Sequence, residues 1–393
     1  MKAMELKKDV YWVGVNDPNL KIFDIIMQTK RGTTYNSYLI NDEKIALFDT
    51  VKHQFFDEYI KNIKSIIGER KIDYIIVQHT ELDHSGSLKK LLECYPEATI
   101  VGSKAAIRNL QNILNRDFKN IPAVGTLDLG KRQLEFISAP NLHWPDTIFT
   151  YDAQDKILFS CDFMGCHYSP KDCITSRCDN DYETEMKYYF DVIMGPFKKF
   201  VRAGLEKIKP LEKDIDVIAP SHGPVHMDKD VDRFIKLYEK WSEGEATEKN
   251  IQVFYVSAYG CTEAMAKFIT KYINNKGIKA ECHEITSESP EVLANKIENA
   301  NGILIGSSTI NQDSVPPVWN LLSLISPITN RGKAATSFGS YGWSGEAVKM
   351  INSRLKDLKL STLEDGFKFN FVPSEEDYKH CEEFLEKYLE LVK

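Results

Sequence analysis

Residues 75–88, IIVQHTELDHSGSL, run from a buried apolar strand directly into four side chains that can bind metal ions: His79, Glu81, Asp83 and His84. Alternation along an extended segment predicts that His79, Glu81 and Asp83 share one face. A turn at Asp83 would bring His84 beside them. One such cluster can supply ligands to two metal ions.

Three further ligand-type residues follow other predicted strands: His143 in NLHWPDT, Asp162 in LFSCDF and His222 in IAPSHGP. A single histidine in such a place is usually an ordinary core or surface residue. That explanation would have to hold for all seven residues at once, whereas a metal site needs convergent ligands from several elements. The sequence therefore predicts a metal centre.

Outward from this cluster, residues 1–236 alternate short β-rich runs with turns and a few helices. A charged stretch at 237–250, LYEKWSEGEATEKN, precedes regular strand–helix alternation. We therefore predict a first domain over residues 1–247 and a second over 251–393. The second pattern predicts a doubly wound parallel sheet of five strands.

The second domain opens with VFYVSAYGCTEAMAKF, which places hydroxyls and a glycine where a strand turns into a helix and can bind phosphate. The Walker and G-x-G-x-x-G patterns are absent, which argues against ATP and nicotinamide dinucleotides. Two more loops, GSSTINQDSVPP and FGSYGWSGEA, follow the next strands, and such loops meet at one sheet edge. The candidate cofactor-binding residues are Ser257, Tyr259, Gly260, Cys261, Thr262, Ser308, Thr309, Ile310, Asn311, Ser340, Tyr341, Gly342, Trp343 and Gly345.

The motifs H-x-E-x-D-H, H-W-P-D-T, S-x-D and S-H-G-P, followed by three flavodoxin-like loops, resemble those of flavodiiron proteins, the A-type flavoproteins. This resemblance spans nearly the whole chain. It implies a metallo-β-lactamase-like αββα sandwich followed by a flavodoxin-like domain that binds FMN. It also implies a catalytic di-iron centre in which His79, Glu81 and His143 bind one iron, Asp83, His84 and His222 bind the other, and Asp162 bridges them.

The function that the resemblance implies is reduction of O2 to water, of NO to N2O, or of both. Electrons would pass through FMN from an external carrier such as rubredoxin, in a head-to-tail homodimer or a tetramer. Glu81 stands where related zinc hydrolases carry histidine, and a hard oxygen ligand favours iron. Two alternatives stay open: a binuclear zinc hydrolase without flavin, and an electron carrier with a vestigial lactamase domain.

Several neighbouring residues leave finer questions open. Asp24, in KIFDII, stands where many family members have histidine in F-H-G-Y, so the sequence does not decide between O2 and NO. His167 matches either a residue that supports a metal ligand or a structural one. Trp144 and Tyr189 are candidates for the wall of the gas pocket, and Cys261 suits either packing beside the phosphate loop or a lowered thiol pKa.

The composition narrows the class of protein further. The chain has 50 Lys+Arg against 57 Asp+Glu, a formal net charge of −7, which argues against nucleic acid as a partner. No apolar stretch suits a signal peptide or a membrane span, so we expect a cytoplasmic protein. The eight cysteines contain no C-x-x-C pair, so we expect no disulfide framework, and we interpret Cys161, Cys166, Cys173 and Cys178 as incidental.

Overall fold

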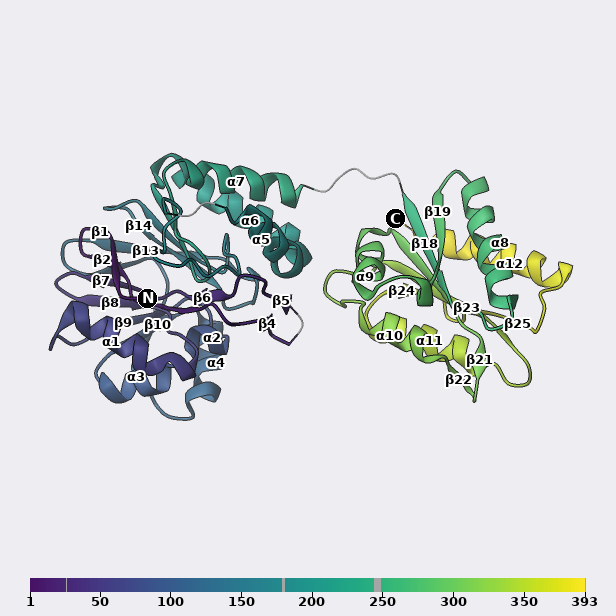
Figure 1. Cartoon of the computed structure of the whole chain (residues 1–393), viewed down its shortest axis with the longest axis horizontal. Coiled ribbons are helices and arrows are strands. Elements are labelled where there is room, and N and C mark those ends of the chain that lie inside the picture. The colour runs from purple at the N-terminus through teal and green to yellow at the C-terminus, as the bar shows by residue number, and fades with distance from the viewer. Residues whose placement is uncertain (26, 179–180, 244–248, 393) are drawn as a thin grey trace. The chain divides into compact units, whose positions relative to one another are not determined.

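The computed structural model describes residues 1–25, 27–178, 181–243 and 249–392. The chain divides into two compact units, Met1–Glu243 and Gly244–Lys393 (Figure 1). The domain limits expected above, 1–247 and 251–393, stay a prediction, because most of the joining stretch lies outside the described residues.

The first unit contains two large β-sheets whose strands alternate between two cores. In the first sheet, Leu47 and Ile75 belong to the core shared with the helices, while Phe48 and Ile76 belong to the core between the sheets. Phe48 stacks on Phe159 of the second sheet with ring centroids 4.0 Å apart. The first sheet has the order β1 (Met4–Lys7), β2 (Val10–Trp12), β7 (Tyr38–Asn41), β8 (Ile45–Phe48), β9 (Tyr74–Val77), β10 (Thr99–Gly102), β11 (Asn120–Pro122). The second has the order β12 (Thr126–Asp128), β13 (Gln133–Ser138), β14 (Ile148–Asp152), β15 (Ile157–Cys161), β16 (Val217–Pro220), β17 (His226–Met227).

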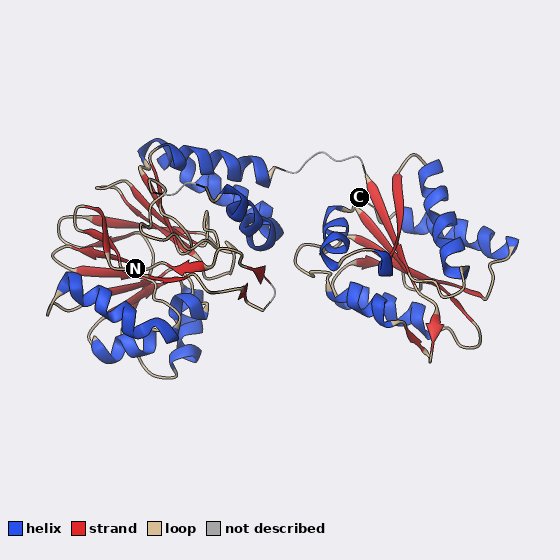
Figure 2. Ribbon diagram, in the orientation of Figure 1, coloured by secondary structure: helices blue, strands red, loops and turns tan. Residues whose placement is uncertain are grey.

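Helices cover both outer faces of this pair of sheets (Figure 2). The first sheet is covered by α1 (Phe56–Ile67), α3 (Leu88–Cys94) and α4 (Lys104–Leu114). The second is covered by α5 (Glu183–Tyr189), α6 (Lys198–Ile208) and α7 (Lys229–Ser242). These four layers are the αββα sandwich that the sequence predicts.

The second unit is a parallel sheet in the order β19 (Lys279–Glu284), β18 (Asn250–Tyr255), β20 (Gly302–Gly306), β23 (Ala334–Tyr341), β24 (Ser361–Thr362). The prediction of five strands leaves one strand after β23. The chain instead forms β24 and β25 (Phe367–Asn370), which pair with opposite ends of β23. One face of the sheet is covered by α8 (Cys261–Asn275) and α12 (Glu375–Leu389), the other by α9 (Pro290–Asn299), α10 (Pro316–Ser323) and α11 (Glu346–Asp357). The doubly wound fold is therefore confirmed.

The cysteine prediction is wrong at one pair. Cys173 and Cys178 form a disulfide, with their Cα atoms 5.9 Å apart, while Cys161 and Cys166 are buried free thiols. The spacing of the cysteines along the chain does not reveal this pairing. Pairing depends instead on a loop that brings the two Cα atoms within disulfide range.

Arg132 is a buried cation that stabilises the first unit. Its guanidinium donates to Asp152 at 2.7 Å and to Asp155 at 2.5 Å. Arg132→Ala would leave these carboxylates without their partner inside the fold, and removing one member of a buried ion pair costs about 3–5 kcal/mol. We expect the urea unfolding transition of the first unit to move to lower concentration by a corresponding amount, as followed by circular dichroism.

Arg177→Ala is the matched control for that variant. Arg177 makes two short hydrogen bonds to Asp228, but both side chains are more than half exposed. Exposed ion pairs contribute about 0–1 kcal/mol. Equal destabilisation by the two substitutions would contradict a special contribution from the buried Arg132 network.

Candidate metal centre and flavin site

Strand β9 ends at Val77, and the chain then turns rather than continuing as a strand. Residues Leu82–Ser85 form a single helical turn, α2, which carries Asp83 and His84. The Ser85 hydroxyl donates to the Thr80 carbonyl at 2.8 Å and supports this turn. The prediction that residues 79–83 alternate along an extended face is therefore wrong, although all four ligand-type side chains still meet.

Two more candidate ligands are brought in by one pair of strands. Strands β15 and β16 run parallel, and Cys161 pairs with Pro220 where both strands end. Asp162 directly follows β15 and His222 lies two residues beyond β16, so the two residues lie side by side. His143 comes from the loop between β13 and β14.

The seven side chains form two groups that share Asp162. In the first group, Nε2 of His79 and Nε2 of His143 lie 3.2 and 3.3 Å from Oε2 of Glu81. The same two nitrogens lie 3.8 and 3.5 Å from Oδ2 of Asp162.

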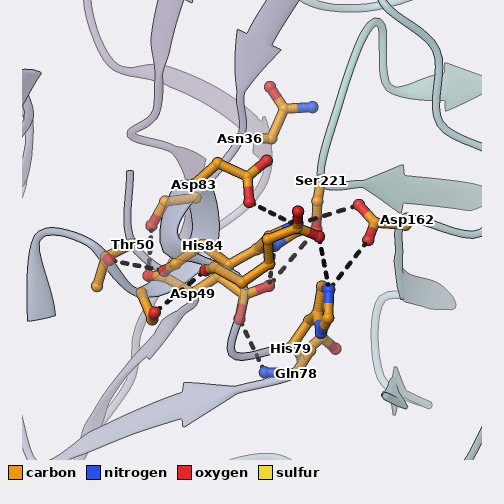
Figure 3. Close-up of polar contacts among 12 residues, drawn as sticks. Asn36, Asp49, Thr50, Gln78, His79, Asp83, His84, Asp162 and Ser221 are labelled. Atoms are coloured by element: carbon orange, nitrogen blue, oxygen red, sulfur yellow. Dashed lines mark hydrogen bonds and ion pairs between the residues drawn. The ribbon is translucent and has the colours of Figure 1, made fainter. Parts of the chain in front are cut away.

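The second group faces the other oxygen of the same carboxylate (Figure 3). Nε2 of His84 and Nε2 of His222 lie 3.2 and 3.4 Å from Oδ1 of Asp162. They lie 3.6 and 3.1 Å from the Oδ1 and Oδ2 atoms of Asp83. A carboxylate with one oxygen toward each group has the arrangement of a ligand that bridges two metal ions.

Buried atoms that make ion-pair contacts but no hydrogen bond test whether metal ions fit here. Both carboxylate oxygens of Asp83, both of Asp162 and Nε2 of His84 are buried at ion-pair distance from groups of the cluster, but none of them forms a hydrogen bond among the described residues. Buried polar atoms without partners are costly. A cation in each group would satisfy them, and four imidazoles with three carboxylates suit a pair of iron ions. The residues therefore fit a di-iron centre.

The histidines and carboxylates of the cluster shift one another's pKa values. Burial opposes protonation of His143, but Asp162 and Glu81 outweigh it and raise the pKa of His143 to about 10. Burial disfavours the ionised Glu81, but His143 and His79 outweigh it and hold the pKa of Glu81 below its usual value. Metal-free His143 thus pairs with these carboxylates as a cation, and a metal ion would take over the role of that proton.

Residues outside the cluster fix the orientation of its histidines. Nδ1 of His79 lies 3.2 Å from each Asp146 oxygen, and one of these oxygens also accepts from the N–H and hydroxyl of Thr80 at 2.7 Å. Asp49 lies 3.5 Å from Nδ1 of His84, and Nδ1–H of His222 donates to the Thr34 carbonyl at 2.6 Å.

Sequence reasoning missed Asp146, Asp49 and Thr34. Asp146 was within reach, because it is the aspartate of the HWPDT motif that carries His143. A carboxylate behind a ligating histidine is a recurring device that sets the tautomer of the ring.

Asp146→Asn tests this orienting role. We expect metal affinity to fall about tenfold, the lower end of the range for such partners, because the amide keeps an acceptor oxygen but loses the charge. Chelator competition on purified protein measures the change. Asp128→Asn is the control, since Asp128 is exposed and, within the described part of the chain, its side chain accepts only a turn N–H from Gly130. Equal affinities for the two variants would contradict the role.

His167 lies behind the cluster, as one of its two interpretations expected. Its ring centroid is 5.5 Å from that of His222 and 4.3 Å from that of Phe23. Nδ1 lies 3.0 Å from the Thr33 hydroxyl, and burial lowers the pKa of His167 to about 3. A neutral imidazole supports His222 by packing and adds no charge to the site.

The proposed wall of the gas pocket is only partly enclosed. Tyr189 is buried against His167, with ring centroids 4.9 Å apart. Trp144 meets His79 edge to face at 4.9 Å and is 39% exposed. Asp24 follows β4 (Ile22–Phe23), and burial together with the neighbouring Glu81 carboxylate raises the pKa of Asp24 to about 7.

In the second unit, the three predicted loops meet at the ends of β18, β20 and β23. The Thr262 hydroxyl lies 3.3 Å from that of Ser308 and 3.0 Å from that of Ser340, so one atom joins all three loops. The hydroxyls of Ser257 and Thr309 are buried without a hydrogen-bond partner among the described residues. These five hydroxyls and the N-terminus of α8 fit a phosphate group.

The remaining candidate residues of this unit are glycines at positive φ, aromatic residues and residues that lie beside them in sequence. Gly260 and Gly345 have φ of +81° and +78°, which a glycine adopts without strain, and a Cβ on Gly345 would come within 2.9 Å of the Tyr341 ring. Tyr259 and Trp343 are 94% and 81% exposed, which leaves flat aromatic surface free at this edge. Asn311 and Gly342 lie in the same loops, Ile310 ends the short strand β21 (Thr309–Ile310), and Cys261 is the first residue of α8.

Family comparisons divide the chain at the same place. The model of the ODP family beta lactamase matches residues 33–223, and the flavodoxin model matches residues 253–384. The flavo-diiron protein FprA2 of Clostridium acetobutylicum is 42% identical over 99% of both chains. The nitric oxide reductase of Moorella thermoacetica is 35% identical over 96% of both chains.

Solved structures agree with these relatives. The flavodiiron protein of Giardia intestinalis superposes with a TM-score of 0.71 at 31% identity and covers 100% of this chain and 98% of its own. The rubredoxin oxygen:oxidoreductase of Desulfovibrio gigas gives a TM-score of 0.74 at 28% identity over 99% and 98%.

Proposed function

Because this chain belongs to the flavodiiron protein family, we propose that it is an oxidoreductase that reduces O2 to water, NO to N2O, or both. Its cofactors are a di-iron centre in the first unit and FMN in the second. The observation that carries this proposal is the pair of ligand groups that share the two oxygens of Asp162.

Each ligand-type residue receives one role. His79, Glu81 and His143 would hold one iron, Asp83, His84 and His222 would hold the other, and Asp162 would contribute to both sites, since it has one oxygen toward each group. The bound irons and flavin supply the redox chemistry. The protein holds the ligand nitrogens in place, with Asp146 behind His79, Asp49 behind His84 and the Thr34 carbonyl behind His222.

The protein around the irons also limits access of water. Tyr189, Phe23 and His167 form a mostly apolar, buried wall beside His222. The neutral state of His167 keeps a further cation out of this wall. Exclusion of water strengthens every electrostatic interaction inside such a site.

The assembly and electron donor are further parts of the proposal. The relatives include a rubredoxin oxygen:oxidoreductase and a flavorubredoxin, which supports a rubredoxin-like carrier as donor. We propose a head-to-tail homodimer, alone or paired into a tetramer, in the cytoplasm. Among the described residues, no helix is long and apolar enough to cross a bilayer.

Elemental and flavin analysis of protein from iron-supplemented cells tests the function first. We expect two irons and one FMN per chain. With rubredoxin reduced under anaerobic conditions, the protein should then consume O2 or NO once the gas is added. Four electrons per O2 and one N2O per two NO are the expected stoichiometries. Two zinc ions without flavin would instead favour the hydrolase, and FMN without metal would favour the carrier.

A further inference from the structure

The disulfide between Cys173 and Cys178 lies at the surface of the first unit. Cys178 is exposed and Cys173 is half-buried. Both line a depression of about 520 Å³, whose wall also includes Tyr168 and Lys171. A thiolate from solution can therefore reach the sulfur of Cys178, which is the access that thiol–disulfide exchange requires.

The disulfide loop is bonded to the segment that follows a metal ligand. The Val225 N–H donates to the Ile174 carbonyl at 2.8 Å, and the Ser176 N–H donates to the Val225 carbonyl at 2.8 Å. The Met227 N–H donates to the Ser176 hydroxyl at 3.0 Å. Val225 is three residues beyond His222, so the loop fixes the backbone that leaves this ligand.

The N-terminal end of the disulfide loop is connected along the chain to Asp162, the ligand that follows β15. From Asp162 the chain passes His167, which packs against His222, and then Pro170, whose carbonyl accepts from Asn16 at 2.8 Å. Cys173 follows three residues later. The disulfide thus lies in a segment that follows Asp162 along the chain and is hydrogen-bonded to Val225 and Met227, just beyond His222.

We propose that Cys173 and Cys178 form a thiol–disulfide switch that sets the rigidity of the chain between Asp162 and Val225. A permanent structural bridge is the weaker explanation. The two cysteines are only five residues apart, and a disulfide that closes a short loop stabilises the folded state least. Exposed disulfides in proteins of reducing compartments are usually redox-sensing or catalytic. The turnover readout rests on the proposed function and the reducing compartment on the proposed cytoplasmic location, whereas thiol reactivity and deuterium uptake test the switch apart from the reduction of O2 or NO.

Reduction and oxidation of the disulfide need no electrons from the metal centre. In reduction, the thiolate of an external dithiol attacks Cys178 and forms a mixed disulfide as the Cys173–Cys178 bond breaks. The second thiol of the reductant then displaces Cys178, so the chain gains two electrons and two protons and the dithiol becomes a disulfide. In the reverse direction, hydrogen peroxide takes the two electrons and two protons and yields two waters.

The test uses the whole metal- and flavin-loaded protein with and without dithiothreitol. We expect two additional thiols to react with a maleimide after reduction, and faster deuterium uptake at the N–H groups of Ser176, Val225 and Met227. Turnover with O2 or NO should fall roughly three- to tenfold, less than the hundredfold that a displacement of 1 Å can cost. Hydrogen peroxide should restore the original values.

Variants distinguish the switch from a general effect of reductant. The double variant Cys173→Ser with Cys178→Ser should match the reduced protein and no longer respond to dithiothreitol. Cys94→Ser, which removes an exposed free cysteine, should respond as the parent does. A disulfide that resists excess dithiothreitol in the folded protein, or a reduction that leaves deuterium uptake and turnover unchanged, would overturn the proposal. These two results come from the parent chain, so the test holds even if the double variant does not fold.

Discussion

Asp162→Ala is expected to reduce metal content from two ions per chain to less than one and to lower O2 or NO reduction by more than about 100-fold. Partners one layer behind a metal ligand already cost ten- to hundredfold when removed, and Asp162 contributes to both ligand groups. Its loss also leaves His84 and His222 without the oxygen that faces them at 3.2 and 3.4 Å. Elemental analysis and turnover on the same preparation measure both effects.

Asp230→Ala is the matched control, because Asp230 is also a buried carboxylate of the first unit and pairs with Arg233 at 3.2 Å on helix α7. We expect this variant to keep its metal ions, whatever it loses in stability. An Asp162→Ala protein that still binds two ions tightly would show that Asp162 is not the bridge.

The seven ligand-type residues could be predicted because the sequence places them after apolar runs. Strands are short and regular, so a polar side chain at the end of a run lies at a sheet edge, as Asp162 and His222 do beyond the paired ends of β15 and β16. The strand–helix alternation of residues 251–393 also determines which loops lie beside each other. That is why the sequence predicts a shared site for Thr262, Ser308 and Ser340, whose hydroxyls are in contact in the structure.

Other features depend on interactions that no local pattern encodes. Asp146 orients His79 across 67 residues of sequence, and only the tertiary fold shows which carboxylate stands behind which ring. The helical turn that carries Asp83 replaces an extended segment, because the Ser85 hydroxyl and backbone groups support a turn there. The disulfide likewise depends on the path of a loop rather than on cysteine spacing.

Thr262→Val is expected to weaken FMN binding by about 10- to 100-fold. Valine keeps the shape of threonine at this fully buried position at the start of α8 but removes the hydroxyl that joins the three loops. Hydrogen bonds to charged groups contribute about 1.5–3 kcal/mol, which corresponds to this range for a phosphate. Titration of the flavin-free protein with FMN, followed by quenching of flavin fluorescence, gives the dissociation constant.

Thr270→Val on the same helix separates this effect from a general weakening of α8. Thr270 donates to the Ala266 carbonyl at 2.8 Å, one helical turn earlier, and among the described residues no hydrogen bond joins its side chain to the three loops. We expect its FMN affinity to stay within about twofold of the parent, since a single hydroxyl bonded to its own helix contributes little to binding at the N-terminus. If both variants bind FMN equally well, then Thr262 does not face the phosphate, and the buried hydroxyls of Ser257 and Thr309 must supply the contacts instead.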